Sequence, residues 1–260
     1  FQYLLIVYFW LMLAAINFDS IDFKINLNQP LDISIPLRAH TENVTAWYVN
    51  APIIEPVRGE GFVGAVAEGG TVNFRNISFN PHGHGTHTEC VGHITKEVFS
   101  VNQLVKQYFF MAKVVTIKPE QTNADQMITK SQIKSIFELN KVDALVVRTL
   151  PNDASKLSRQ YSSTNPAFIH HEAMQLIVDS GIEHLLIDTP SVDKEVDNGA
   201  LISHNVFWQT DKVVRKSASI TEMVYVNNNI ADGNYVLNLQ FAPFENDASP
   251  SRPVLFKLIT

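Results

Sequence analysis

Three stretches in the first third of the chain largely alternate between apolar and polar residues. They are "IDFKINL" (21–27), "LDISI" (31–35) and "TVNFRNISF" (71–79). Alternate side chains of an extended chain point to the same face, so this pattern predicts half-buried β-strands. We therefore expect the first half of the chain to be mostly β-structure.

The spacing of apolar residues changes from about residue 131. Ser131 is a suitable N-cap for a helix that carries Ile133, Ile136 and Phe137 on one face. The apolar run "ALVVRT" (144–149) follows, and its length and β-branched residues predict a buried strand.

A second helix is predicted after Asn165-Pro166, an N-cap followed by proline at the first helical position. Its apolar face would consist of Ile169, Ala173, Leu176 and Ile177, and Gly181 stands where a helix-ending glycine belongs. "HLLID" (184–188) predicts another buried strand, and "TEMVYV" (221–226) and "NYVLNLQFA" (234–242) return to strand character. These segments together predict an α/β fold with a mixed, largely β core and one domain over residues 17–260.

The apolar segment 1–16, "FQYLLIVYFWLMLAAI", stands apart from this pattern. It is shorter than the roughly 20 residues that a membrane-spanning helix needs. Three interpretations stay open: a truncated signal peptide, a stretch translated from a misplaced start, or a core strand or helix. The expected location is cytoplasmic, or periplasmic or secreted if the segment is a signal peptide.

Charge and cysteine content restrict the classes of partner. The formal net charge is −6 and the basic residues are scattered, which argues against a nucleic-acid binder. The single cysteine, Cys90, excludes an intrachain disulfide and a multi-cysteine zinc site. We expect a small-molecule substrate and no membrane partner.

The segment "FNPHGHGTHTECVGHI" (79–94) contains four of the nine histidines. On a strand His87, Glu89 and His93 share one face, so His87 and Glu89 can bind the same ion. His93 would lie roughly 20 Å from His87 on a straight strand, so it can join them only if the chain bends, for which Gly92 is available.

The first part of the segment leaves its metal ligand open. Gly83 and Gly85 flank His84 and permit a tight turn that brings either His82 or His84 beside His87. Nitrogen and carboxylate ligands suit zinc, manganese or iron(II). The competing interpretation is a surface loop with solvated histidines, but the alternating register and the turn glycines favour a metal site.

"HGTHTECVGH" (84–93) resembles the signature H-x-G-T-H-x-D-x-P-x-H of the metal-dependent cyclase family, which includes bacterial kynurenine formamidase and isatin hydrolase. Further blocks of that family follow in the same order: "VVRTLP" (146–151), "LLIDTPSVD" (185–193), His204 with "NVFW", "ITEM" (220–223) and "ASPSRPVL" (248–255). The resemblance covers about residues 31–258 and implies the family's swivelling β/β/α fold.

The resemblance also implies roles for individual residues. The implied metal ligands are His87, Glu89, His204 and Glu222, with His82 favoured over His84 as the remaining histidine ligand. His93 matches the catalytic proton donor and acceptor, and Trp47 matches an aromatic residue of the substrate pocket. The family's first histidine ligand falls on Gly83, Glu89 replaces its aspartate and Val91 replaces its proline. These departures leave the first ligand and the number of ions, one or two, open, and they argue against kynurenine formamidase itself.

The implied activity is hydrolysis of an amide, an N-formyl aryl amide or a lactam by water that zinc or manganese activates, in a homodimer or larger homo-oligomer. The alternative is a catalytically inactive protein of the same fold that binds a metal or another ligand.

Overall fold

A closed sheet forms the centre of the molecule. The computed structural model describes residues 11–18, 20–136 and 142–259. Within these residues seven strands form a ring, because β16 pairs with β9 at one end of the strand order and with β17 at the other. Around the ring these strands are β16 (Gly233–Phe241), β9 (Phe109–Ile117), β12 (Ala144–Thr149), β14 (His184–Ile187), β15 (Ser219–Glu222), β8 (His87–Glu89) and β17 (Ala248–Lys257). The expected α/β fold with a largely β core is confirmed.

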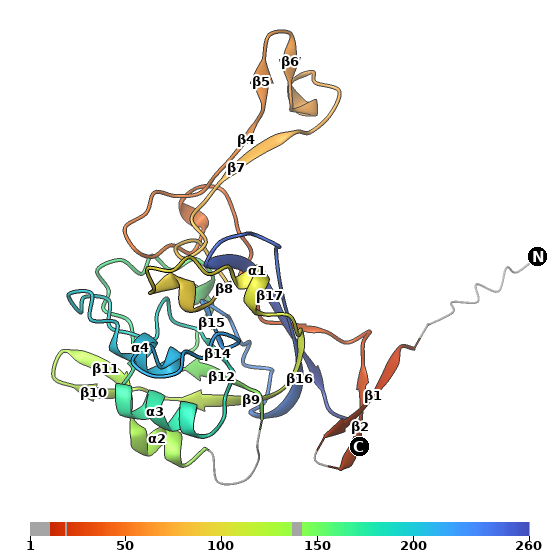
Figure 1. Ribbon diagram of the computed structural model, residues 1–260. Helices are drawn as coiled ribbons and strands as arrows, with labels where there is room; N and C mark the ends of the chain where they lie inside the picture. Colours follow the sequence, from red (N-terminus) through yellow and green to blue (C-terminus); the bar gives the residue numbers. More distant parts are fainter. Residues whose placement is uncertain (1–10, 19, 137–141, 260) are drawn as a thin grey trace, which may run out of the picture.

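Helices cover one side of the parallel part of this sheet, which consists of β9, β12, β14 and β15 (Figure 1). They are α2 (Lys130–Lys134), α3 (His171–Asp179) and α4 (Ile202–Trp208). Along β12, Leu145 and Val147 pack in a buried cluster with residues of these helices. Ala144 and Val146, on the opposite face, belong to a second cluster with residues of β16 and β17. One apolar run thus supplies two cores, as expected of a strand that is buried on both faces.

The remaining strands lie at the periphery. β3 (Leu31–Asp32) pairs with β17, and β1 (Leu13–Phe18) forms a hairpin with β2 (Ile21–Asn26). An arm that projects from the body contains β4 (Ile53–Pro56), β5 (Arg58–Gly59), β6 (Phe62–Val63) and β7 (Arg75–Ser78) (Figure 1). A small sheet consists of β10 (Glu120–Thr122), β11 (Asp125–Ile128) and β13 (Phe168–Ile169), and the short helix α1 spans Val101–Leu104.

The strands expected from apolar runs are present, and those expected from alternation are partly shorter. The strands predicted at 144–149, 184–188 and 234–242 correspond to β12, β14 and β16. The strand predicted at 31–35 contains only two residues, and the one predicted at 71–79 is β7 of the arm, outside the central sheet. The alternating apolar and polar residues predicted an extended chain in these segments. How much of that chain forms a strand depends on the strands available to pair with it.

Both predicted helices exist, but each prediction of the helix start was wrong. Helix α2 is capped by Thr129, which forms a reciprocal capping box with Gln132, and Ser131 lies inside the helix. Phe137 lies outside the described residues. Helix α3 begins after His170, because Ile169 pairs with β11 as part of strand β13. It ends as expected, with Gly181 in the left-handed conformation at φ 82°.

The boundary expected at residue 16 falls inside strand β1. Ala14, Ile16 and Phe18 of this strand pack against the core cluster beneath the helices. Residues 13–16 therefore belong with the domain and not with a separate segment, while residues 1–10 lie outside the described part. In the described part, no helix combines the length and the apolar character needed to span a membrane.

Candidate metal centre

Two neighbouring antiparallel strands and one helix bring the candidate ligands together. His87 and Glu89 lie on β8, and Glu222 on β15 is the register partner of His87. His204 lies on α4, which covers the same face of the sheet. All four side chains are buried. Residues that are distant in the sequence thus converge between strand and helix.

The polar atoms of these side chains face one another at distances that a shared ion would span. Oε2 of Glu89 lies 3.1 Å from Nδ1 of His82, and Oε1 of Glu89 lies 3.3 Å from Nε2 of His204. Nε2 of His87 lies 3.3 Å from Oε2 of Glu222. The donor atoms of His82, His87 and Glu89 all lie within 4.8 Å of one another, as do those of Glu89, His93 and His204.

Four of the buried atoms at the centre have no hydrogen-bond partner among the described residues: Nε2 of His87, Nε2 of His204 and both carboxylate oxygens of Glu89. Buried polar groups in native proteins are nearly always satisfied, and a missing ion is one of the recognised reasons for an exception. One or two divalent cations bound beside Glu89 would give these atoms a partner, with His82 and His87 on one side and His93 and His204 on the other. The residues present therefore fit a metal ion of the kind that nitrogen and carboxylate ligands hold.

The opposite ring nitrogen of each of three histidines is held by an acceptor. Nδ1 of His87 lies 3.0 Å from the carbonyl oxygen of Gly85. Nδ1 of His204 lies 2.7 Å from Asp193, and Nε2 of His82 lies 2.8 Å from Asp247. Metal-binding histidines almost always donate their second N–H to such an acceptor, which fixes the tautomer and the ring orientation.

Opposite charges shift the pKa values of several groups in the centre. Burial by itself would lower the pKa of His82, but Asp247 and Glu89 outweigh it and raise the pKa to about 10. Asp193 and Glu89 likewise overcome burial and raise the pKa of His204 to about 10. Burial would raise the pKa of Glu89, but the adjacent histidines hold it well below its usual range. A metal ion would compete with these protons, so its binding should release them.

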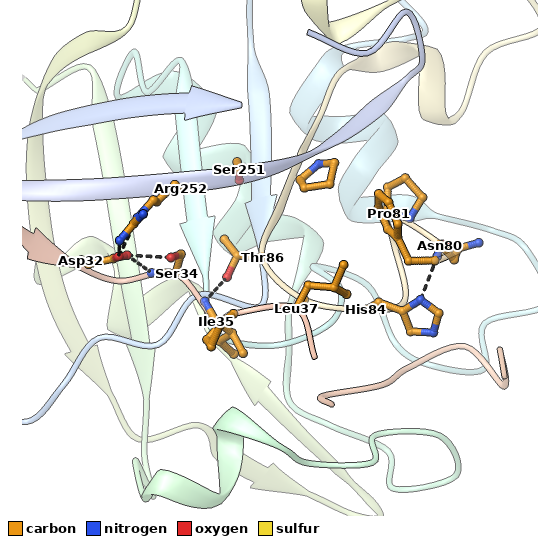
Figure 2. A pocket seen from close by; sticks show the side chains of 14 residues that line it. Asp32, Ser34, Ile35, Leu37, Asn80, Pro81, His84, Thr86, Ser251 and Arg252 are labelled. Atoms are coloured by element: carbon orange, nitrogen blue, oxygen red, sulfur yellow. Dashed lines mark hydrogen bonds and ion pairs between the residues drawn. The ribbon is translucent and has the colours of Figure 1, made fainter. Parts of the chain in front are cut away.

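In the turn before β8, the two histidines that are alternative candidates for the first metal ligand point in different directions. His82 points into the centre, whereas His84 accepts from the backbone N–H of Asn80 at 2.7 Å and lies 2.8 Å from the carbonyl of Asn50. Figure 2 shows His84 at one end of a different pocket, about 500 Å³ in volume. A Cβ atom on Gly83 would lie 2.7 Å from a methyl group of Val49, so a larger residue at position 83 would require Val49 to move.

His93 reaches the centre because the chain bends after Glu89, as expected. Val91–His93 form one turn of 3-10 helix, and Nε2 of His93 lies 3.9 Å from Glu89. A Cβ atom on Gly92 would lie 2.3 Å from the carbonyl oxygen of Phe99, so close packing requires glycine here.

A cavity of about 290 Å³ opens onto the centre. It is lined by Trp47, Asn80, His82, His93, Ser191, Leu201, His204 and Glu222. The larger pocket in Figure 2 is not lined by any of the residues with unsatisfied atoms, so its size does not make it the candidate metal site. A small cavity lined by aromatic, apolar and polar groups is suited to a small-molecule substrate.

Two residues of the centre were not identified from the sequence. Asp193 ends the block 185–193, and it accepts from the backbone N–H groups of Ser203 and His204 as well as contacting the imidazole of His204. Asp247 directly precedes the block "ASPSRPVL" and lies beside His82 and His93. Contacts with His82 and His93 hold the pKa of Asp247 well below its usual range, so it is a carboxylate at neutral pH.

Several other residues with side chains that could bind a metal lie outside the centre. Cys90 is buried with Val101 and Val105, and burial raises the pKa of its thiol to about 11. His184 is buried against Phe110, and His170 and His171 lie at the start of α3.

A family model described as "Putative cyclase" matches residues 29–194. A kynurenine formamidase from Bacillus cereus (strain ATCC 10987 / NRS 248) is 25% identical over 227 residues, which are 86% of this chain and 96% of that protein.

Solved structures share the fold. An isatin hydrolase A from Labrenzia aggregata, bound to benzyl benzoate, superposes with a TM-score of 0.64 at 14% identity and covers 88% of this chain and 93% of its own. A structure described as a predicted metal-dependent hydrolase from Bacillus stearothermophilus has a TM-score of 0.60 at 16% identity and covers 88% and 98%, respectively.

Proposed function

The chain belongs to the cyclase family, and from this premise we propose that it is a metal-dependent hydrolase of an amide, an N-formyl aryl amide or a lactam. The kynurenine formamidase and isatin hydrolase among its relatives support a carbonyl–nitrogen bond as the target. The departures at Gly83, Glu89 and Val91 leave the particular substrate open within that class.

The observation that carries the proposal is the set of four buried, unsatisfied atoms on His87, Glu89 and His204. With His82 and Glu222 these residues would hold the ion. The donors are imidazole nitrogens and carboxylate oxygens, which zinc and manganese both accept. Glu89 presents one oxygen toward His82 and the other toward His204, so it can serve one ion or bridge two.

A bound divalent cation supplies Lewis acidity, which lowers the pKa of water and polarises a carbonyl group. His93 would supply proton transfer at the same place, because it lines the cavity and its Nε2 lies 3.9 Å from Glu89. We assign it two steps. Nε2 takes a proton from the attacking water as the new C–O bond forms, and it delivers that proton to the nitrogen as the C–N bond breaks. An open-chain amide gives a carboxylic acid and an amine, and a lactam gives one ring-opened product that carries both groups, so the atoms balance without a further reactant.

The cavity walls would orient the substrate. Trp47 would offer an aromatic side chain to a flat ring, and Ser191 lines the same cavity. Aromatic side chains bury much area and favour stacked or edge contacts with other rings. An aryl group on the scissile amide would therefore have a binding surface next to the reacting carbonyl.

The test is turnover of three compounds by the full chain: a formanilide, an unstrained aliphatic amide and the lactam isatin. We expect hydrolysis of the formanilide or of isatin, loss of it after chelation, and recovery on addition of zinc or manganese. Stoichiometric metal binding with no turnover of any compound would refute the hydrolase. It would favour the alternative of a metal- or ligand-binding protein of this fold.

A further inference from the structure

One carboxylate oxygen contacts two histidines of the centre at the same time. Oδ2 of Asp247 lies 2.8 Å from Nε2 of His82 and 3.4 Å from Nδ1 of His93. The two imidazole rings lie against each other, with centroids 4.3 Å apart and an interplanar angle of 30°. Asp247 immediately precedes β17, which pairs with β8. The sheet thus brings the carboxylate to the rings.

The contacts of Asp247 determine which ring nitrogens remain available. A carboxylate only accepts hydrogen bonds, so it favours a hydrogen on Nε2 of His82 and on Nδ1 of His93. A neutral imidazole has one donor and one acceptor nitrogen. The acceptor nitrogens left over are Nδ1 of His82, 3.1 Å from Glu89, and Nε2 of His93, 3.9 Å from Glu89. Both therefore face the metal centre.

We propose that Asp247 is the positioning residue of this centre. It orients His82 to bind metal through Nδ1, and it holds His93 in the tautomer whose Nε2 is free to accept a proton. The distance of 3.4 Å to His93 is at the long end of hydrogen bonding. Catalytic hydrogen bonds are often long before substrate binds. The inference rests on the proposed function, because it assigns a task to the proton-transfer step of that reaction.

Replacement of Asp247 by asparagine removes the charge and keeps the shape. An asparagine can turn its NH₂ group toward Nδ1 of His93, which favours the wrong tautomer. When the analogous carboxylate of a serine protease triad is replaced in this way, turnover falls about 10⁴-fold. We expect Asp247→Asn to lower kcat by about 10²–10⁴-fold with a much smaller change in KM. We also expect it to weaken metal binding by about 10–100-fold.

The measurement combines three readouts on zinc-loaded protein. Metal affinity is measured by chelator competition, and kcat and KM are measured at saturating zinc. The tautomer of His93 is determined from ¹⁵N chemical shifts, which are assigned with His93→Gln. Glu245→Gln is the matched control, because Glu245 is an exposed carboxylate two residues away that contacts Asn102 and Gln103 instead. Asp247→Glu keeps a carboxylate and should recover at least about tenfold of the lost kcat.

The outcomes separate this inference from the proposed function. A wild-type protein that hydrolyses nothing refutes the function, whereas the ¹⁵N spectrum still tests the tautomer of His93. If the wild type is active and metal-saturated Asp247→Asn retains its kcat and its tautomer, Asp247 is not a positioning residue. If Asp247→Asn does not fold, Asp247→Ser is measured in its place. A shift of His93 toward Nε2–H together with the loss in kcat supports the proposal.

Discussion

Replacing the two histidines of the turn before β8 one at a time should separate metal binding from loop structure. His82 directs Nδ1 to a point 3.1 Å from Glu89, and His84 contacts only the backbone of Asn80 and Asn50 with its ring nitrogens. We expect His82→Ala to lose metal and His84→Ala to keep it. The two residues are close in sequence and both lie in the turn, so each variant is the control for the other.

The magnitudes follow from what each ring contacts. Apparent binding free energies of four-ligand zinc sites are about 10–16 kcal/mol. If this free energy is shared equally among the ligands, one ligand contributes about 3 kcal/mol. Loss of that ligand should raise Kd by about two orders of magnitude. His84→Ala removes two hydrogen bonds to backbone groups of exposed residues, where water can partly replace the ring. It should lower the free energy of unfolding by about 1–2 kcal/mol.

The assay is chelator competition for Kd and urea unfolding of the metal-free protein for stability. The expected result is a loss of zinc affinity confined to His82→Ala and normal zinc affinity in a moderately destabilised His84→Ala. Loss of zinc in His84→Ala with normal binding in His82→Ala would refute the assignment of the first ligand.

Three further predictions follow from the same contacts. His93→Ala should keep its metal and lose at least about a hundredfold in turnover; a metal-free variant would show that His93 is a ligand. Asp193→Asn should weaken zinc binding by about 10–100-fold, measured by chelator competition, because Asp193 orients the imidazole of His204 at 2.7 Å; unchanged affinity would contradict this. Burial lowers the pKa of His184 to about 4, so between that pH and about 6.5 the unfolded chain binds a proton that the folded chain does not, and stability rises with pH in this window. The unfolding free energy of the wild type, from urea titrations, should fall by up to about 3 kcal/mol more than that of His184→Gln between pH 7 and pH 4, and parallel curves would disprove it.

Local sequence patterns predicted the elements that depend on local physics. The segments 144–149 and 184–188 are apolar on both faces, because helices cover one face and the other face lines the interior of the ring. The predicted bounds of these two strands are therefore close to the observed ones. The start of α3 was missed because pairing of Ile169 with β11 competes with a helical turn, and Asn165 adopts a φ of 47° instead of capping the helix. The closure of the ring by β16 and β17 is a pairing between chain segments that no short pattern specifies.

The residues of the centre also differ in how far local sequence patterns predict them. His87 and Glu89 share a face by strand alternation, and the bend at Gly92 was available to bring His93 close. His204 and Glu222 were assigned only through the family resemblance, since nothing in their local sequence places them beside β8. Asp193 and Asp247 were missed because they contact histidines and not the proposed ion. Their positions could have indicated a role at the centre, because Asp193 lies within the family-like block 185–193 and Asp247 directly precedes the block 248–255.

The central claim is that this buried centre binds a divalent ion, and metal content measures it directly. Purified protein is incubated with zinc or manganese, freed of unbound metal, and analysed by elemental mass spectrometry next to His87→Ala. We expect about one or two equivalents in the wild type and a severe loss in the variant, because Nε2 of His87 is one of the four unsatisfied atoms. Less than about a tenth of an equivalent in folded wild-type protein, or equal content in both proteins, would contradict the account.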